Sequence, residues 1–212
     1  MREARRLLAE LLARPDLRPL MNRLREYDGS TYRHSLRVAR FALVLARGDG
    51  FDDAQLRELA VAAMMHDLGK LSVDPGVVRK PGPLDDRERD EIRRHPAESV
   101  DWLRGLAAFP EAHRIAPLHH EMQGQHAPYP RSGTERRKPD DAREAERRRQ
   151  LPAWVRRAGH ILALADRYDA LISRRPYKDP WPDPEVRAVL LREMPAVAPL
   201  LDHLRPPERP PR

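Results

Sequence analysis

The stretch from Met64 to Lys70, MMHDLGK, places a histidine and an aspartate side by side at the end of an apolar run. Burying a carboxylate or an imidazole without a partner is costly, and a bound metal ion can supply that partner. Lys70 follows Asp67 by three residues and His66 by four, so a helix would carry these side chains on one face. A charged lysine cannot bind a metal, but it can reach a phosphate oxygen held by metal ions.

A second adjacent pair, His119 and His120, stands before Glu121 near the end of another predicted helix. The chain has 9 histidines and no cysteine, so any metal must be bound by imidazole and carboxylate groups. This donor set suits manganese, iron, zinc or nickel rather than a structural zinc. The candidate ligands within or at the ends of predicted helices are His34, His66, Asp67, His95, His119, His120 and Asp166.

Each candidate taken alone has an ordinary alternative. His34 and His95 could be common core or surface histidines, and Asp166 could pair with Arg167 or Arg37. The metal site is therefore indicated by the joint pattern of these residues and not by any single one of them. The remaining histidines are expected to lie outside it: His113, His126, His160 and His203.

The elements that must position these residues are helices almost throughout. Apolar residues recur with the 3.6-residue period over 36–46 and 56–64. Asp52 or Asp53 can cap the second helix, and Gly69 fits its C-terminal end. No long segment alternates like a strand, so the sequence predicts an all-α domain. Further helices are expected over about 85–105, 111–121, 153–174 and 184–194, with a Pro/Gly loop over 72–83.

Composition narrows the class of protein. Lys and Arg total 40 against 33 Asp and Glu, a net charge of +7, but the excess is spread along the chain without interleaved aromatic residues, which disfavours nucleic-acid binding. No apolar run approaches ~20 residues and the N-terminus lacks a signal peptide, so we expect a cytoplasmic protein with no membrane partner. Oligomeric state is not predicted by the sequence. The expected divisions are a helical lead-in (1–27), the site domain (28–204), a polar insertion within it (131–150) and a disordered Pro-rich tail (205–212).

Seven short motifs follow one another along residues 28–180. They are HSLRVA from His34, HDLGK from His66, KPGPL from Lys80, HP at His95, HHE from His119, ADRYDAL containing Asp166, and RPYK from Arg175. Taken together, they resemble the HD superfamily of metal-dependent phosphohydrolases, and its HD-GYP subfamily in particular.

The resemblance implies an all-helical bundle around a binuclear metal site and phosphodiesterase activity on cyclic di-GMP, giving pGpG and then GMP. Iron or manganese is favoured, with zinc, nickel or magnesium as alternatives. It implies that Asp67 bridges the ions, that Lys70 contacts the scissile phosphate, and that Arg175 and Lys178 bind substrate phosphate or guanine. The ligands that it implies are His34, His66, Asp67, His95, His119, His120 and Asp166.

The chain departs from the subfamily pattern in two places. In HHEMQGQHAPYP the Asp-Gly pair is missing, and Pro128 stands where a glycine is expected before Tyr129. Members with three metals carry a glutamate one turn before the first histidine, where this chain has Ser30, so two ions are expected.

Three functions stay open at this point. The favoured one is a phosphodiesterase in which two divalent cations make a hydroxide available near neutral pH. The altered signature loop leaves room for an HD-type hydrolase of another nucleotide or cyclic nucleotide. The third is a binding module for cyclic dinucleotides that has lost catalysis.

Overall fold

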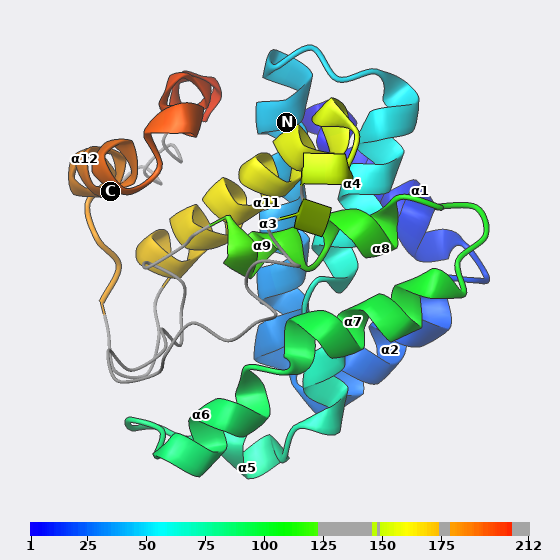
Figure 1. Cartoon of the computed structure of the whole chain (residues 1–212), viewed down its shortest axis with the longest axis vertical. Helices are drawn as coiled ribbons and strands as arrows, with labels where there is room; N and C mark the ends of the chain where they lie inside the picture. The colour runs from blue at the N-terminus through cyan, green and yellow to red at the C-terminus, as the bar shows by residue number, and fades with distance from the viewer. Residues whose placement is uncertain (123–145, 148, 174–178, 205–212) are drawn as a thin grey trace.

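The computed structural model describes residues 1–122, 146–147, 149–173 and 179–204. Over these ranges the chain is helical and contains no strand, which confirms the all-α prediction. Three helices form the centre of the molecule: α3 (Gly29–Gly48), α4 (Asp53–Met65) and α11 (Ala153–Ile172), which pack against one another (Figure 1). These helices supply about half of the buried apolar side chains, so the core is centred on them.

Local hydrogen bonds explain where the first two central helices begin. The Asp28 carboxylate accepts a hydrogen bond from the Thr31 N–H at the start of α3. Asp52 and Gln55 form a reciprocal capping box at the start of α4, which confirms Asp52 as the cap. Between the two helices Gly50 has a φ of 86°, a backbone conformation that glycine adopts readily and that permits this tight turn.

The N-terminal segment forms two helices, α1 (Arg2–Ala13) and α2 (Arg18–Tyr27), and both pack against α3. Their apolar residues are buried in the same core as those of the central helices. Leu11 and Leu24, for example, have no exposed surface. The helical lead-in thus shares the core of the site domain.

Two predicted helices are each split by a proline. The expected helix over 85–105 is two helices, α6 (Asp86–Ile92) and α7 (His95–Arg104), and the expected helix over 111–121 is α8 (Ala112–Ile115) and α9 (Leu118–Glu121). Pro96 and Pro117 lack the N–H that a continuous helix requires. The single-helix predictions are therefore wrong, and the breaks turn histidines into helix-terminal residues.

The segment after α4 also differs from expectation. The helix ends at Met65, and Gly69 lies in a 3-10 turn, η1 (Leu68–Ser72), instead of at the helix end. The expected loop over 72–83 contains a short helix, α5 (Pro75–Val78). Consequently His66 and Asp67 lie between a helix and a turn, where the backbone changes direction.

The C-terminal part forms α12 (Asp183–Glu193), as predicted, followed by an unpredicted 3-10 segment, η3 (Pro195–His203). Both pack against α11 on one side of the molecule (Figure 1). The Tyr168 hydroxyl donates to the Asp183 carboxylate at 2.9 Å and joins α11 to α12. Among the described helices, none is both long and apolar enough to span a bilayer.

Several predicted features lie outside the described residues. They include Arg175, Lys178, His126, the signature loop around Pro128, and the tail 205–212. Most of the polar insertion 131–150 does so too, although residues 146, 147, 149 and 150 are helical and exposed.

Candidate metal centre

The seven predicted ligands come together from five parts of the chain. Six of them form two groups whose donor atoms lie within 4.8 Å of one another inside each group. We call His34, His66 and Asp67 the first cluster, and His95, His119 and His120 the second cluster. The seventh residue, Asp166 on α11, has its Oδ1 atom 3.1 Å from Nε2 of His34.

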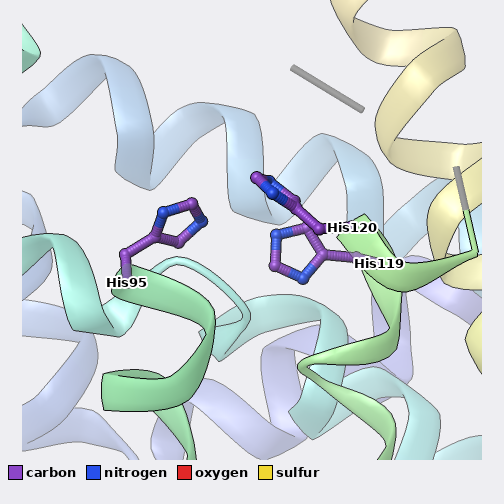
Figure 2. A group of neighbouring side chains, drawn as sticks. All are labelled: His95, His119 and His120. Carbon is purple, nitrogen blue, oxygen red and sulfur yellow. The ribbon is translucent and has the colours of Figure 1, made fainter. Parts of the chain in front are cut away.

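The second cluster is made of helix-terminal histidines. His95 is the first residue of α7, and His119 and His120 lie in the single turn of α9. Figure 2 shows the three rings directed toward a common space from these two helices. The ring centroids of His119 and His120 are 4.2 Å apart, and those of His95 and His120 are 4.8 Å apart.

Three histidines share one hydrogen-bonding arrangement. In His66, His95 and His119, Nδ1 donates to the backbone carbonyl three residues earlier, at 2.8, 2.6 and 2.6 Å. A carbonyl only accepts, so Nδ1 carries the hydrogen and Nε2 of the neutral ring carries a lone pair. This fixes the tautomer and orientation that a metal-binding histidine needs.

The electrostatic surroundings keep most of these rings neutral. Burial lowers the pKa of His66, and burial lowers the pKa of His119 well below its usual range. Burial and then the neighbouring His95 ring lower the pKa of His120 to about 3. Near pH 7 these three imidazoles are therefore neutral, and each keeps a nitrogen lone pair that a metal ion could use.

Two of the ring nitrogens have no hydrogen-bond partner among the described residues. The Nε2 atoms of His95 and His119 are both buried, and neither makes a hydrogen bond within the described part of the chain, although Nε2 of His95 lies 3.2 Å from a carboxylate oxygen of Asp67. Such atoms are costly to bury unless an electron-pair acceptor meets them. A divalent cation is such an acceptor, and imidazole and carboxylate donors suit a transition metal, so the residues present fit a metal centre.

Asp67 belongs to the first cluster and also contacts a histidine of the second cluster. Its Oδ1 is 3.2 Å from Nε2 of His95, and its Oδ2 is 3.5 Å from Nε2 of His66. Oδ2 also accepts a hydrogen bond from Nζ of Lys70 at 2.7 Å. Burial opposes ionisation, but the charge of Lys70 together with the neighbouring His66 and His95 rings outweighs burial and holds the pKa of Asp67 well below its usual range. The two oxygens of one buried carboxylate thus face different clusters.

His34 is held between two carboxylates. Its Nδ1 donates to Oδ2 of Asp169 at 2.8 Å, while Nε2 faces Asp166. Burial alone would lower the pKa of His34, but the hydrogen bonds with Asp166 and Asp169 outweigh it and raise that pKa to about 9. The ring is therefore charged in the metal-free protein, and a bound cation would replace the proton on Nε2.

Asp169 is the residue that the sequence analysis missed. It has no exposed surface, and the Arg37 guanidinium binds it through Nε at 2.7 Å and Nη2 at 2.9 Å. Asp169 follows Asp166 by three residues on an apolar helix, a spacing that puts both carboxylates on one face. That spacing, inside the ADRYDAL motif, was the available signal.

The alternative pairings considered for Asp166 do not occur. Arg37 binds Asp169, and Arg167 binds Glu193 at 3.0 Å. The other described histidines, His113, His160 and His203, belong to neither cluster, as expected.

Comparison with known proteins places the chain in a family. The HD domain family model matches residues 31–171. The chain is 32% identical over 171 residues to a cyclic di-GMP phosphodiesterase of Thermotoga maritima, covering 77% of this chain and 40% of that protein.

Two further relatives are similar at 30% identity. One is the cyclic di-GMP phosphodiesterase response regulator RpfG of Xanthomonas campestris, with 73% of this chain and 36% of the relative covered. The other is the 3′3′-cGAMP-specific phosphodiesterase 2 of Vibrio cholerae, with 82% of this chain and 30% of the relative covered. The chain thus spans well under half the length of these relatives. Because the family model matches most of the sequence, the chain belongs to the HD domain family.

Proposed function

We propose that this chain is a metal-dependent phosphodiesterase that hydrolyses a cyclic dinucleotide, and that cyclic di-GMP is its substrate. The observation that carries the proposal is the pair of buried ligand clusters joined by Asp67. Relatives named for cyclic di-GMP and for 3′3′-cGAMP support the substrate class. We assign the activity to residues 28–204, with residues 1–27 as helical support.

We propose two metal ions, held by the two clusters together with Asp166. The seven ligands would be His34, His66, Asp67, His95, His119, His120 and Asp166. The resemblance to metal-dependent phosphohydrolases favours iron or manganese, with zinc, nickel or magnesium as alternatives. Five of these seven ligands are imidazoles, which suit iron, zinc and nickel better than magnesium. Two bound divalent cations would supply a hydroxide nucleophile near neutral pH and neutralise charge on the phosphate.

Lys70 is proposed to bind the scissile phosphate. Its side chain is 16% exposed whereas that of Asp67 is 2% exposed, so the lysine reaches from the buried ligands toward solvent. An ammonium in this position can donate charge-assisted hydrogen bonds to phosphate oxygens while still screening Asp67. Replacing Lys70 with Met should reduce turnover while leaving most of the bound metal in place.

Arg175 and Lys178 are proposed to bind the distal phosphate or guanine of the dinucleotide, a prediction that rests on the sequence. An arginine can bind such a group through two parallel hydrogen bonds, and a lysine acts as a point charge. The double substitution to Ala should raise KM for cyclic di-GMP strongly and barely change hydrolysis of an aryl phosphodiester. Equal losses on both substrates would contradict this role.

The experiment that tests the function combines metal analysis with a substrate panel. Protein reconstituted with manganese, or with iron under anaerobic conditions, is incubated with cyclic di-GMP, 3′3′-cGAMP, mononucleotides and an aryl phosphodiester. We expect two metal equivalents per chain and conversion of cyclic di-GMP to pGpG or GMP. Hydrolysis restricted to other nucleotides would favour the alternative hydrolase, and tight dinucleotide binding without turnover would favour the binding module.

A further inference from the structure

The hydroxyl of Ser99 meets three backbone groups in the interior of the protein. Ser99 lies on α7 with no exposed surface, one helical turn after His95. The Gly69 N–H donates to its Oγ at 2.9 Å. The same oxygen lies 2.7 Å from the His66 carbonyl and 2.9 Å from the His95 carbonyl.

Two of these contacts join separate elements. A serine in a helix commonly bonds to the carbonyl four residues earlier, so the contact with His95 is an ordinary one. The contacts with His66 and Gly69 instead reach from α7 to the end of α4 and to η1. A hydroxyl has one proton to donate and lone pairs to accept with, so it can serve the His66 carbonyl and the Gly69 N–H together.

Gly69 lies at the closest approach of the turn and the helix. A Cβ atom on Gly69 would lie 2.1 Å from the His95 carbonyl oxygen and 2.8 Å from the Ser99 nitrogen, distances that real side chains do not allow. Its φ is not positive, since Gly50 is the only positive-φ glycine among the described residues. The glycine is needed here for the close approach and not for an unusual backbone conformation.

The residues on the two sides of this contact are ligands of different clusters. On one side, His66 and Asp67 belong to the first cluster and directly precede η1. On the other side, His95 begins α7 and belongs to the second cluster. Asp67 and His95 are already 3.2 Å apart across the boundary, so a small shift of α7 would change their separation directly.

We propose that Ser99 and Gly69 set the spacing between the two clusters, with Ser99 acting as a positioning residue for His95. This inference rests on the proposed function, because it presupposes that both clusters bind ions. Ser99 touches neither the ions nor the substrate in this view. It acts through the main chain that carries His66 and His95.

The test compares two buried serines. Ser99→Ala removes all three contacts, whereas Ser35→Ala is a matched control on α3. Ser35 also has no exposed surface and lies next to a predicted ligand, but its hydroxyl makes no hydrogen bond with any described residue. Manganese is titrated into each metal-free protein, and magnetic coupling between the two bound ions is followed by electron paramagnetic resonance.

We expect Ser99→Ala to weaken binding of one of the two ions about 10- to 100-fold, the range typical of residues that orient ligands, and to change the coupling signal. Ser35→Ala should leave both unchanged. Ser99→Cys keeps the shape of the side chain but replaces the hydroxyl with a larger and weaker hydrogen-bonding group. Its metal affinity should lie between those of the unaltered protein and Ser99→Ala, and it decides the question if Ser99→Ala does not fold.

A second pair of variants tests the close approach. Gly69→Ala should also weaken binding of one ion. Gly105→Ala, at the other end of α7, should have no effect, because the nearest atom to its added Cβ is 3.9 Å away. Unchanged affinities and coupling in both Ser99→Ala and Gly69→Ala would overturn the inference.

The metal stoichiometry of the unaltered protein distinguishes failure of the proposed function from failure of this inference. If the unaltered protein bound fewer than two ions, the two-metal function would be wrong whatever the variants did. Crystal structures of the metal-free unaltered protein and of Ser99→Ala would then still decide the positioning role. A wider gap between η1 and α7 in the variant supports it, and an unchanged gap overturns it.

Discussion

The two ligand clusters differ in how their polar atoms are satisfied within the protein. In the first cluster, Asp67 accepts a hydrogen bond from Lys70, and His34 donates to Asp169, which Arg37 binds in turn. The second cluster consists of imidazoles alone. There the buried Nε2 atoms of two of its histidines make no hydrogen bond with any residue in the described part of the chain.

This difference has an energetic consequence. The first cluster has its charges balanced by partners that the protein itself supplies. Each unsatisfied nitrogen of the second cluster costs about 1–3 kcal/mol, which a bound ion would recover. The comparison indicates that a bound ion would stabilise the second cluster more than the first.

The largest effect is expected where the two clusters meet. Asp67→Asn keeps the shape of the side chain but removes the charge and one of the two oxygens. We expect loss of most bound metal and a fall in activity beyond the roughly 100-fold that marks the upper end of effects from ligand-orienting residues. Elemental analysis and hydrolysis of cyclic di-GMP check this, and full metal content with normal turnover would show that the ligand assignment is wrong.

Removing the metal should destabilise the second cluster in particular. At a free metal concentration about 100 times the dissociation constant, one ion adds about 2.7 kcal/mol to the free energy of unfolding. Thermal unfolding with a chelator and with added manganese measures the difference. His119→Gln should reduce this metal-dependent gain, while an equal gain in that variant would contradict the contrast between the clusters.

Asp169→Asn tests the partner of the first cluster. The substitution removes the charge that orients His34, so metal affinity should fall about 10- to 100-fold. Asp49→Asn is the matched control, because Arg157 binds Asp49 through the same two atoms at 2.7 and 2.8 Å, away from both clusters. Titration with manganese distinguishes the variants, and equal losses in both would refute a specific role for Asp169.

The smallest effect is expected at His160. Its Nδ1 donates to the Arg156 carbonyl at 2.9 Å, much as the cluster histidines bond to theirs, but it belongs to neither cluster. His160→Ala should leave metal stoichiometry unchanged and alter the free energy of unfolding by about 1 kcal/mol or less. A loss of one metal equivalent would extend the site beyond the two clusters.

Much of this arrangement was predictable from the sequence. The periodic apolar residues of 36–46, 56–64 and 153–174 predicted the three central helices, because burial of one face imposes the helical period. The predicted ligands stood out as polar residues on apolar helices. The cap at Asp52 was readable because capping depends on residues close together in the chain.

What the sequence analysis missed depends mostly on contacts between distant segments. The breaks before α7 and α9 were signalled by Pro96 and Pro117, yet the periodicity on both sides favoured one helix. The role of Asp169 requires α3 and α11 to be side by side, and that of Ser99 requires α7 against η1. Helix propensity and hydrophobic periodicity describe one element at a time, so they do not predict which elements pack against each other.

The hydrogen bond between His34 and Asp169 spans 135 positions of the chain. During synthesis the ribosome makes α3 early and α11 late, and domains fold as their last segments emerge. His34 therefore lacks its orienting carboxylate until α11 has left the exit tunnel. The complete hydrogen-bonding arrangement around His34 therefore forms only after nearly the whole HD domain has been translated.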